Sequence, residues 1–287
     1  MTDALKHLTK LLRPVAISTD LYRGIGSCND GADATYGGHF LGQASAAAMQ
    51  TVEQDRHIHS LHAYFIRGGK PGKPIDYHVE RTRDGRTFCT RRVVAKQNDK
   101  TLFELSASFS KLEPGESIAA SPPADFSSLP KPETLPLYKD LMGAQDPLPL
   151  PEDWAMRDSG IDIRVLNAPW TTLGPSEDMG IRMWVRANGQ ADDDPKLHAA
   201  MLAYQTDESL ADIVLIPFDK TWCSEGTFCV SLDHALWFHQ PINLNAWHFV
   251  DQSVVTAKNG RGVGNGRVWS AAGELVASFT QEVLFRL

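Results

Sequence analysis

The chain has 287 residues, of which 42% are hydrophobic and 22% are charged, and its formal net charge is −7. This length supports one large domain or two modest ones, while the acidic balance argues against general nucleic-acid binding, which needs a basic surface. No run of 18 apolar residues is present, so we expect no membrane-spanning helix. We expect a cytoplasmic protein, because the N-terminal segment is too polar for a signal peptide and the final Phe-Arg-Leu lacks the small residue of a peroxisomal signal.

The first 111 residues predict two helices followed by four strands. Leu5, Leu8 and Leu12 lie on one helical face, which Thr2 or Asp3 caps and Pro14 ends. An alanine-rich stretch, 37–55, predicts a second helix that can lie close against a sheet. Runs rich in β-branched and aromatic residues then predict strands at 58–67, 74–83, 87–97 and 102–111.

A proline-rich segment, 112–159, separates these elements from the rest of the chain. It contains nine of the 17 prolines. Because proline cannot donate a hydrogen bond to a sheet, the segment predicts a crossing linker between an N-terminal unit (1–111) and a C-terminal unit (160–287).

The C-terminal unit predicts the same order of elements. Three aspartates, 192–194, stand before Pro195 and are typical of a helix start with a negative first turn, so a helix is expected through 198–210. Strands are expected at 228–239, 247–258, 261–271 and 275–286.

The two units also repeat each other in sequence. HSLHAYF at His59 returns as SLDHALWFH at Ser231, and ELSASFSK returns as ELVASFTQ. His62 maps onto His234 with an offset of 172 residues, and Ser108-Phe109 onto Ser278-Phe279 with an offset of 170. A duplicated unit implies an intrachain pseudo-dimer, in which the two sheets can pair edge to edge and so protect their edge strands.

Several long motifs carry a family resemblance. The strings YGGHFLGQA, HSLHAYFIRGG, RDGRTFCTRRVVAKQND, WVRANG, LDHALWFHQPINLNAWHFVD and ELVASFTQE resemble the acyl-CoA thioesterase II family. The resemblance implies an α+β double hot-dog fold, with two antiparallel sheets that each wrap a central helix. It also implies hydrolysis of acyl-CoA without a metal or other cofactor, and assembly into a homodimer or higher homo-oligomer.

The same resemblance implies three catalytic residues, all in the C-terminal unit: Asp207, Ser231 and Gln281. Ser231 stands where other members have threonine, and both supply a hydroxyl. A thioester carbonyl needs an oriented water, a proton acceptor and hydrogen-bond donors, which these side chains can provide. The repeat aligns Ser231 with His59 and Gln281 with Lys111, so the units diverge at these positions and a single site per chain is expected.

His59 offers an alternative reading as a general base. A histidine paired with a carboxylate would fit a hot-dog enoyl-CoA hydratase or dehydratase. A third possibility is a protein that binds acyl-CoA without catalysis. His57, His59 and His62 also outline an HxHxDH zinc motif, but Leu61 replaces its aspartate, and on a strand His62 would face away from the other two. We therefore predict no metal.

A basic strip runs through residues 67–96, with nine lysines and arginines against three acidic residues. CoA carries three phosphate groups, so Arg91 and Arg92 are candidates to bind it, and Arg261 and Arg267 are further candidates. A solvated strand face explains the strip equally well.

Overall fold

The structure is a computed structural model that describes residues 1–26, 34–144, 152, 159–167, 169, 173–174 and 179–287. The N-terminal unit contains helices α1 (Asp3–Leu11) and α2 (Gly37–Met49). Its strands are β1 (Val15–Ser18), β2 (Leu21–Ile25), β3 (His57–Phe65), β4 (Pro74–Asp84), β5 (Phe88–Gln97) and β6 (Lys100–Ser110).

The second half of the chain repeats this plan with two helices after its first strands. The helices are α5 (Pro195–Gln205) and α6 (Leu210–Leu215). The strands are β7 (Ile161–Val165), β8 (Ile181–Ala187), β9 (Phe228–Ser231), β10 (Asp233–Phe238), β11 (His248–Lys258), β12 (Arg261–Ser270) and β13 (Leu275–Arg286).

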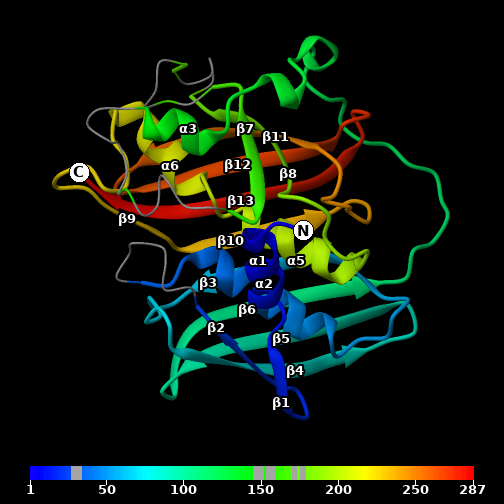
Figure 1. Ribbon diagram of the computed structural model, residues 1–287. Coiled ribbons are helices and arrows are strands. Elements are labelled where there is room, and N and C mark those ends of the chain that lie inside the picture. Colours follow the sequence, from blue (N-terminus) through cyan, green and yellow to red (C-terminus); the bar gives the residue numbers. More distant parts are fainter. Residues whose placement is uncertain (27–33, 145–151, 153–158, 168, 170–172, 175–178) are drawn as a thin grey trace.

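The two expected antiparallel sheets are joined into one. Among the described residues the strands form a 13-stranded sheet in the order β1-β2-β4-β5-β6-β3-β10-β13-β12-β11-β8-β7, with β9 beside β13 (Figure 1). The halves meet where β3 and β10 pair antiparallel, with Leu61 opposite Leu236. This seam confirms the predicted edge-to-edge pairing, and it satisfies the backbone groups of two strands that would otherwise be exposed edges.

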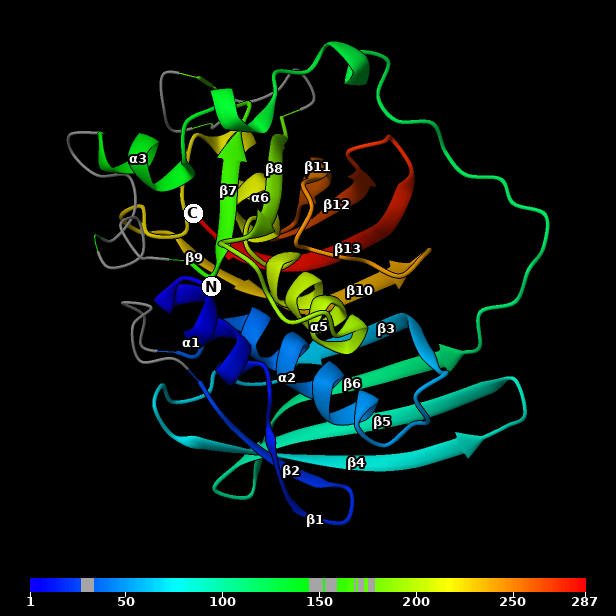
Figure 2. The ribbon, with the colours of Figure 1, turned by 45° about the vertical axis from the view of Figure 1, so that its right-hand side comes forward.

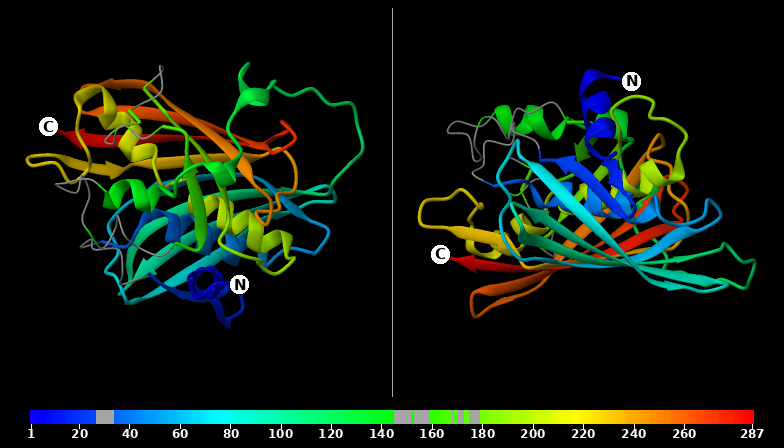
Figure 3. Two further views of the ribbon diagram at one scale, coloured as in Figure 1. Left: turned by 45° about the horizontal axis from the view of Figure 1, so that its top comes forward. Right: turned by 90° about the horizontal axis from the view of Figure 1, so that it is seen from below.

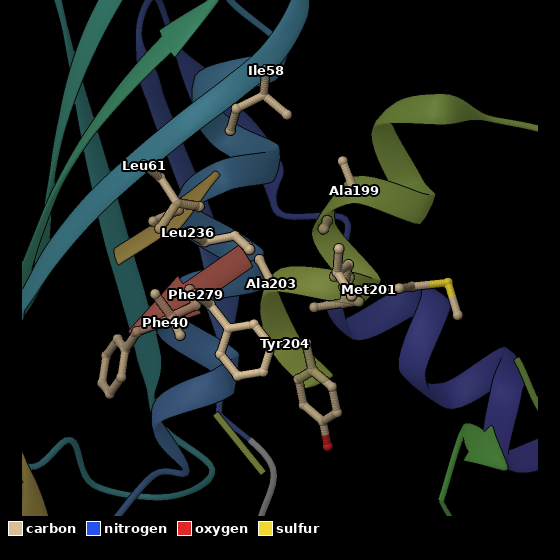
Figure 4. Close-up of a cluster of buried hydrophobic side chains, with 14 of the residues drawn as sticks. Phe40, Ile58, Leu61, Ala199, Met201, Ala203, Tyr204, Leu236 and Phe279 are labelled. Carbon is tan, nitrogen blue, oxygen red and sulfur yellow. The ribbon is translucent and has the colours of Figure 1, made fainter. Parts of the chain in front are cut away.

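The two central helices, α2 and α5, lie side by side on the same face of the sheet (Figure 2). Small residues on both helices allow this contact: Ala44, Ala47 and Ala48 on α2, and Ala200 and Ala203 on α5, are all fully buried. In the close-up of Figure 4, Leu61, Leu236 and Phe279 gather beside α5. The main core therefore spans both halves, and the seam runs through it.

Local sequence signals explain most of these elements. Thr2 caps α1 as predicted, since its hydroxyl accepts a hydrogen bond from the Leu5 amide at 3.2 Å, and Leu5 and Leu8 are buried. Asp194 likewise caps α5, whose first residue is Pro195. Seven long strands, β3, β4, β5, β6, β11, β12 and β13, lie where the alternating runs predict them, whereas the single strand expected at 228–239 is divided into β9 and β10. The short strands β1, β2, β7 and β8 were not predicted, and β1 is exposed along its whole length.

The linker contains secondary structure of its own and packs against the second half. Its described part, 112–144, contains two short 3-10 turns, Phe126–Ser128 and Pro132–Thr134, and helix α3 (Tyr138–Gly143). Phe126, Leu129 and Leu135 pack against an aromatic cluster that β8, β11 and β12 contribute, namely Trp184, Phe249 and Trp269. Neighbouring Val250 and Val268 belong to the main core, so this cluster lies on the face of the sheet away from the central helices, which Figure 3 shows on one side of the sheet. Residues 126–135 of the linker thus cover part of the outer face of the second half, whereas Tyr138 and Leu141 of α3 pack against the main core.

The predicted alignment of His62 with His234 is wrong, because the two residues lie on opposite faces of their strands. His62 is exposed and its ring contacts Trp237, whereas His234 is 1% exposed and belongs to the inner face. A shift of one residue exchanges the two faces of a strand, so a repeat offset taken from residue identity alone can miss the structural equivalent. Among the described residues, no helix is long and apolar enough to cross a membrane.

Candidate active site

Asp207, Ser231 and Gln281 come together at one end of the seam. Asp207 follows the end of α5, Ser231 ends β9, and Gln281 lies in β13. The Gln281 Nε2 donates to Ser231 Oγ at 2.8 Å, and Ser231 Oγ lies 3.5 Å from Asp207 Oδ1. Gln281 also hydrogen-bonds the Asp207 carboxylate. The structure therefore places the three residues in one connected cluster, although they are separated by 24 and 50 positions in the chain.

His234 extends this cluster into the core. Its Nδ1 lies 2.6 Å from Gln281 Oε1, and its Nε2 lies 3.1 Å from Thr206 Oγ1. Because an amide oxygen can only accept, Nδ1 carries the proton, and Nε2 faces the Thr206 hydroxyl, which also lies 3.1 Å from the Ala203 carbonyl. Burial lowers the pKa of His234 to about 4, while its hydrogen bond to Gln281 acts in the opposite direction. The neutral imidazole therefore orients the Gln281 amide, whose nitrogen is turned toward Ser231 and Asp207.

The first half contributes the start of α2. The Asp207 carboxylate accepts a hydrogen bond from the backbone N–H of Gly38, at a helix end whose N-cap residue, Tyr36, makes no side-chain capping bond. A Cβ atom on Gly37 would lie 2.5 Å from Asp207 Oδ2 and 2.8 Å from Phe65 Cε1. Glycine is therefore required for this close approach, and Asp207 caps a helix of the other half.

Burial raises the pKa of Asp207 to about 7. Hydrogen bonds from Gln281, Gly38 and Ser231 act against this effect, and the charge of Glu208 adds to it. The carboxylate is 6% exposed. A carboxyl group with a pKa near neutral pH suits a general base, since it can accept a proton from water and return it within one cycle.

His59 lies elsewhere, and the structure does not bring it to these three residues. Its Nε2 is 2.8 Å from Ser108 Oγ. In β3 it is four positions from Ala63, which is paired with His234, a separation of roughly 13 Å along the strand. His57 and His59 line a cavity together with Ile58, and His62 does not line it. Within the described part of the chain, no group of three or more His, Cys, Asp or Glu side chains is arranged to hold a metal.

The four arginines considered for CoA also lie away from the cluster. Arg91 is 1% exposed and donates to Thr51, to the Arg83 carbonyl and to Asp84, so its donors hold the N-terminal unit together. Arg92 pairs with Glu104 at 2.8 Å on the exposed face of β5. Arg261 and Arg267 occupy exposed positions of β12, whereas Gly264, paired with Gln281, is buried. By strand alternation these two arginines project from the face opposite Gln281.

Comparison with known proteins assigns the family. Residues 26–110 match the model of the acyl-CoA thioesterase N-terminal domain, and residues 132–285 match that of the C-terminal domain. The chain is 35% identical to acyl-CoA thioesterase 2 of Haemophilus influenzae, over 100% of this chain and 99% of that protein. The chain belongs to the acyl-CoA thioesterase II family.

Other relatives of the thioesterase agree with this assignment. Acyl-coenzyme A thioesterase 8 of Rattus norvegicus is 34% identical over 97% of this chain and 88% of that protein. The solved acyl-CoA thioesterase II TesB2 of Mycobacterium marinum is 30% identical, with a TM-score of 0.75 over 97% of this chain and 98% of that structure. A hot-dog protein of Alicyclobacillus acidocaldarius, 18% identical with a TM-score of 0.78, supports the fold alone. The chain is thus an acyl-CoA thioester hydrolase with the predicted double hot-dog fold.

Three features of this thioesterase site were not predicted: the orienting His234, its partner Thr206, and the glycines that begin α2. A signal for each is present in the sequence. His234 falls on the buried face once the register of the strand is known, and the Gly37-Gly38 pair forms the start of a helix, where backbone N–H groups lack partners within the helix.

Proposed function

We propose that the protein hydrolyses fatty acyl-CoA to a free fatty acid and CoA by direct attack of water. Asp207 is the general base, and Ser231 and Gln281 hold the attacking water. The observation that carries this proposal is the hydrogen-bonded cluster of the three side chains around a buried carboxyl group whose pKa lies near neutral pH. Each positioned group is expected to contribute roughly 1–4 kcal/mol to transition-state stabilisation.

In the proposed reaction, a water molecule held by Ser231 Oγ and the Gln281 amide transfers a proton to Asp207 as its oxygen bonds to the thioester carbonyl carbon. The tetrahedral oxyanion then collapses, the C–S bond breaks, and the CoA thiolate leaves with the proton that Asp207 returns. Ser231 is not expected to act as a nucleophile, because its hydrogen-bond partners among the described residues, Asp207 and Gln281, include no histidine. His234 contacts Gln281 and Thr206 instead.

The alternative of an enoyl-CoA hydratase or dehydratase has less support. Such a reaction needs a histidine working beside a carboxyl group at the site, yet His59 is hydrogen-bonded to Ser108 and His234 is held between Gln281 and Thr206. A protein that binds acyl-CoA without catalysis gains nothing from a buried aspartate, because burial of a carboxylate costs free energy.

A thiol-release assay with saturated and enoyl acyl-CoA substrates tests the proposal. Asp207→Asn, Ser231→Ala and Gln281→Leu are each expected to lower kcat/KM by about 10²-fold or more. Asp55→Asn, which changes a carboxylate whose side chain is 54% exposed, is the matched control and is expected to keep full activity. Thiol release that survives Asp207→Asn would overturn the assignment, as would hydration of enoyl-CoA without thiol release.

Trapping tests the route of attack. Under single-turnover conditions, direct attack by water leaves Ser231 unmodified in intact-protein mass spectra, whereas an acyl adduct on Ser231 would replace this mechanism by a covalent one.

Assembly and location complete the proposal. We expect whole chains to associate into homodimers or larger homo-oligomers in the cytoplasm. Light scattering coupled to size-exclusion chromatography measures the oligomeric state. The unit boundaries at 111 and 160 remain a prediction, which limited proteolysis of the linker can test.

A further inference from the structure

A cavity lies at the end of the seam opposite the active site. It has a volume of about 410 Å³, within the range of roughly 300–1,000 Å³ that is usual for small-molecule sites. Its walls come from the end of α2, the start of α5, the first residues of β3, the end of β6 and the segment after β10. None of the residues assigned to the active site lines it.

This position is the symmetry mate of the active site. At the active site, Asp207 after the end of α5 meets the start of α2, beside Gln281 of β13. At the cavity, Met49 at the end of α2 meets Pro195 and Lys196 at the start of α5, beside Ser110 of β6. The approximate twofold axis passes between β3 and β10, where Leu61 faces Leu236, and it exchanges these elements in pairs. Duplication of the unit therefore produced two such positions.

The catalytic groups have no counterpart in the cavity. Its one aspartate, Asp194, is occupied by capping α5, since Oδ1 accepts from the Lys196 amide at 3.0 Å. Two imidazoles of its wall are hydrogen-bonded to serines on neighbouring strands: His59 to Ser108, and His239, 2.9 Å from Ser278 Oγ. A water molecule in this cavity would find no carboxylate arranged as Asp207 is, so hydrolysis is not expected there.

The lining is both apolar and cationic. Ile58, Ala199 and Phe238 give an apolar wall, and Figure 4 shows Ile58 and Ala199 at one end of the core cluster with Tyr204 at the other. Lys196, whose ammonium donates to the Met49 carbonyl at 2.7 Å, and Arg56 supply positive charge. Arg56 is paired with Asp55 at 3.9 Å, so Lys196 is the cation that an apolar chain with a single negative group would meet here. The uncharged methyl end of an acyl chain would not match a wall that carries a charged ammonium group.

We propose that this cavity is a second, non-hydrolytic site that binds a long-chain carboxylate. The inference rests on the proposed function for the class of ligand, because a free fatty acid is the product of that reaction. The cavity accommodates a carboxylate beside Lys196 and an alkyl chain along Ile58, Ala199 and Phe238. Acyl-CoA is a poorer match, since the ammonium of Lys196 does not balance three phosphate groups.

Dodecanoate is the probe, and its binding to the full chain is measured by calorimetry and by the NMR shift of its ¹³C-labelled carboxyl group. Two variants alter the cavity: Lys196→Met removes the charge but keeps the alkyl stem, and Ser110→Phe fills the space. Lys6→Met, at an α1 lysine whose side chain is 61% exposed, is the matched control. Melting temperatures confirm that each variant folds. The two substitutions lie on different elements, so a structural defect in one variant would not explain a loss of binding in both.

We expect both cavity variants to lose one equivalent of bound dodecanoate per chain, with affinity weakened at least about tenfold, while kcat/KM for thiol release stays unchanged and Lys6→Met behaves as the unaltered protein. Unchanged binding in both variants would overturn the proposal. Selective loss of long-chain acyl-CoA hydrolysis would also overturn it, because the cavity would then be the end of the substrate channel. Absence of thiol release in the unaltered protein would refute the proposed function instead, and the loss of bound dodecanoate remains measurable in that case.

Discussion

Replacement of His234 by leucine tests whether this residue positions the catalytic amide. In the structure His234 Nδ1 donates to Gln281 Oε1 at 2.6 Å, which leaves Gln281 Nε2 to donate to Ser231 at 2.8 Å and to hydrogen-bond Asp207. Without the imidazole, nothing at this contact distinguishes the amide oxygen from the amide nitrogen. The Asp207 carboxylate then loses a donor that favours its ionised form.

The size of the expected pKa shift follows from loss of the hydrogen bond between Gln281 and the Asp207 carboxylate. A hydrogen bond to a charged group contributes roughly 1.5–3 kcal/mol, which corresponds to about 1–2 pH units. Loss of a donor to the ionised form raises a carboxyl pKa, so the acid limb of kcat/KM moves upward from about 7. At pH 7 the smaller carboxylate fraction alone lowers kcat/KM roughly 5- to 50-fold.

The assay is the pH dependence of kcat/KM for thiol release in three variants. His234→Leu is expected to shift the acid limb, His234→Gln to restore part of it through its amide N–H, and His62→Leu, an exposed histidine at the same seam, to leave it in place. An unshifted limb in a folded His234→Leu variant would refute the positioning role, because a merely structural defect lowers the rate without moving the limb.

Three further predictions follow from the same geometry. Burial raises the pKa of Asp207 from 3.8 to about 7, so its contribution favours folding below pH 4 and is lost as the pH rises to 7. Asp207→Asn should therefore increase the free energy of unfolding more at pH 8 than at pH 4, by up to about 4 kcal/mol, with a correspondingly larger rise in melting temperature at pH 8 in differential scanning calorimetry. Gly37→Ala brings a methyl group against Asp207 Oδ2 and Phe65, and should lower kcat/KM at least about tenfold in a protein whose circular dichroism is unchanged. Arg267→Gln should change KM for acyl-CoA by less than about twofold because this side chain projects from the face opposite Gln281, whereas Arg91→Gln should reduce expression of folded protein by leaving buried carbonyl groups unpaired.

Sequence periodicity predicted the elements that contain enough residues to show a pattern. The long strands alternate clearly, and the helix around Ala44 to Ala48 is unusually rich in small residues. Strands of four to seven residues, such as Val15–Ser18 and Ile181–Ala187, show too few alternations to stand out, and they take their places by pairing with longer neighbours.

The candidate site was predicted unevenly for a related reason. Asp207, Ser231 and Gln281 were reached through motif resemblance, and nothing in their local sequence distinguishes them from solvent-facing polar residues. His234 was read as part of the repeated framework because its face of the strand depends on the register across the seam. The exposed arginines were chosen by charge alone, and charge does not tell which side of a sheet a side chain occupies.

Asp207 of the second half caps α2 of the first half, so the two halves depend on one shared residue. A carboxylate that serves both as proton acceptor and as the end of a helix from the other repeat cannot be exchanged without disturbing both units. Separate copies of the ancestral unit would have needed to meet before either could complete such a site. Once the copies were fused, one of the two equivalent positions could keep this shared carboxylate while the other was released to change.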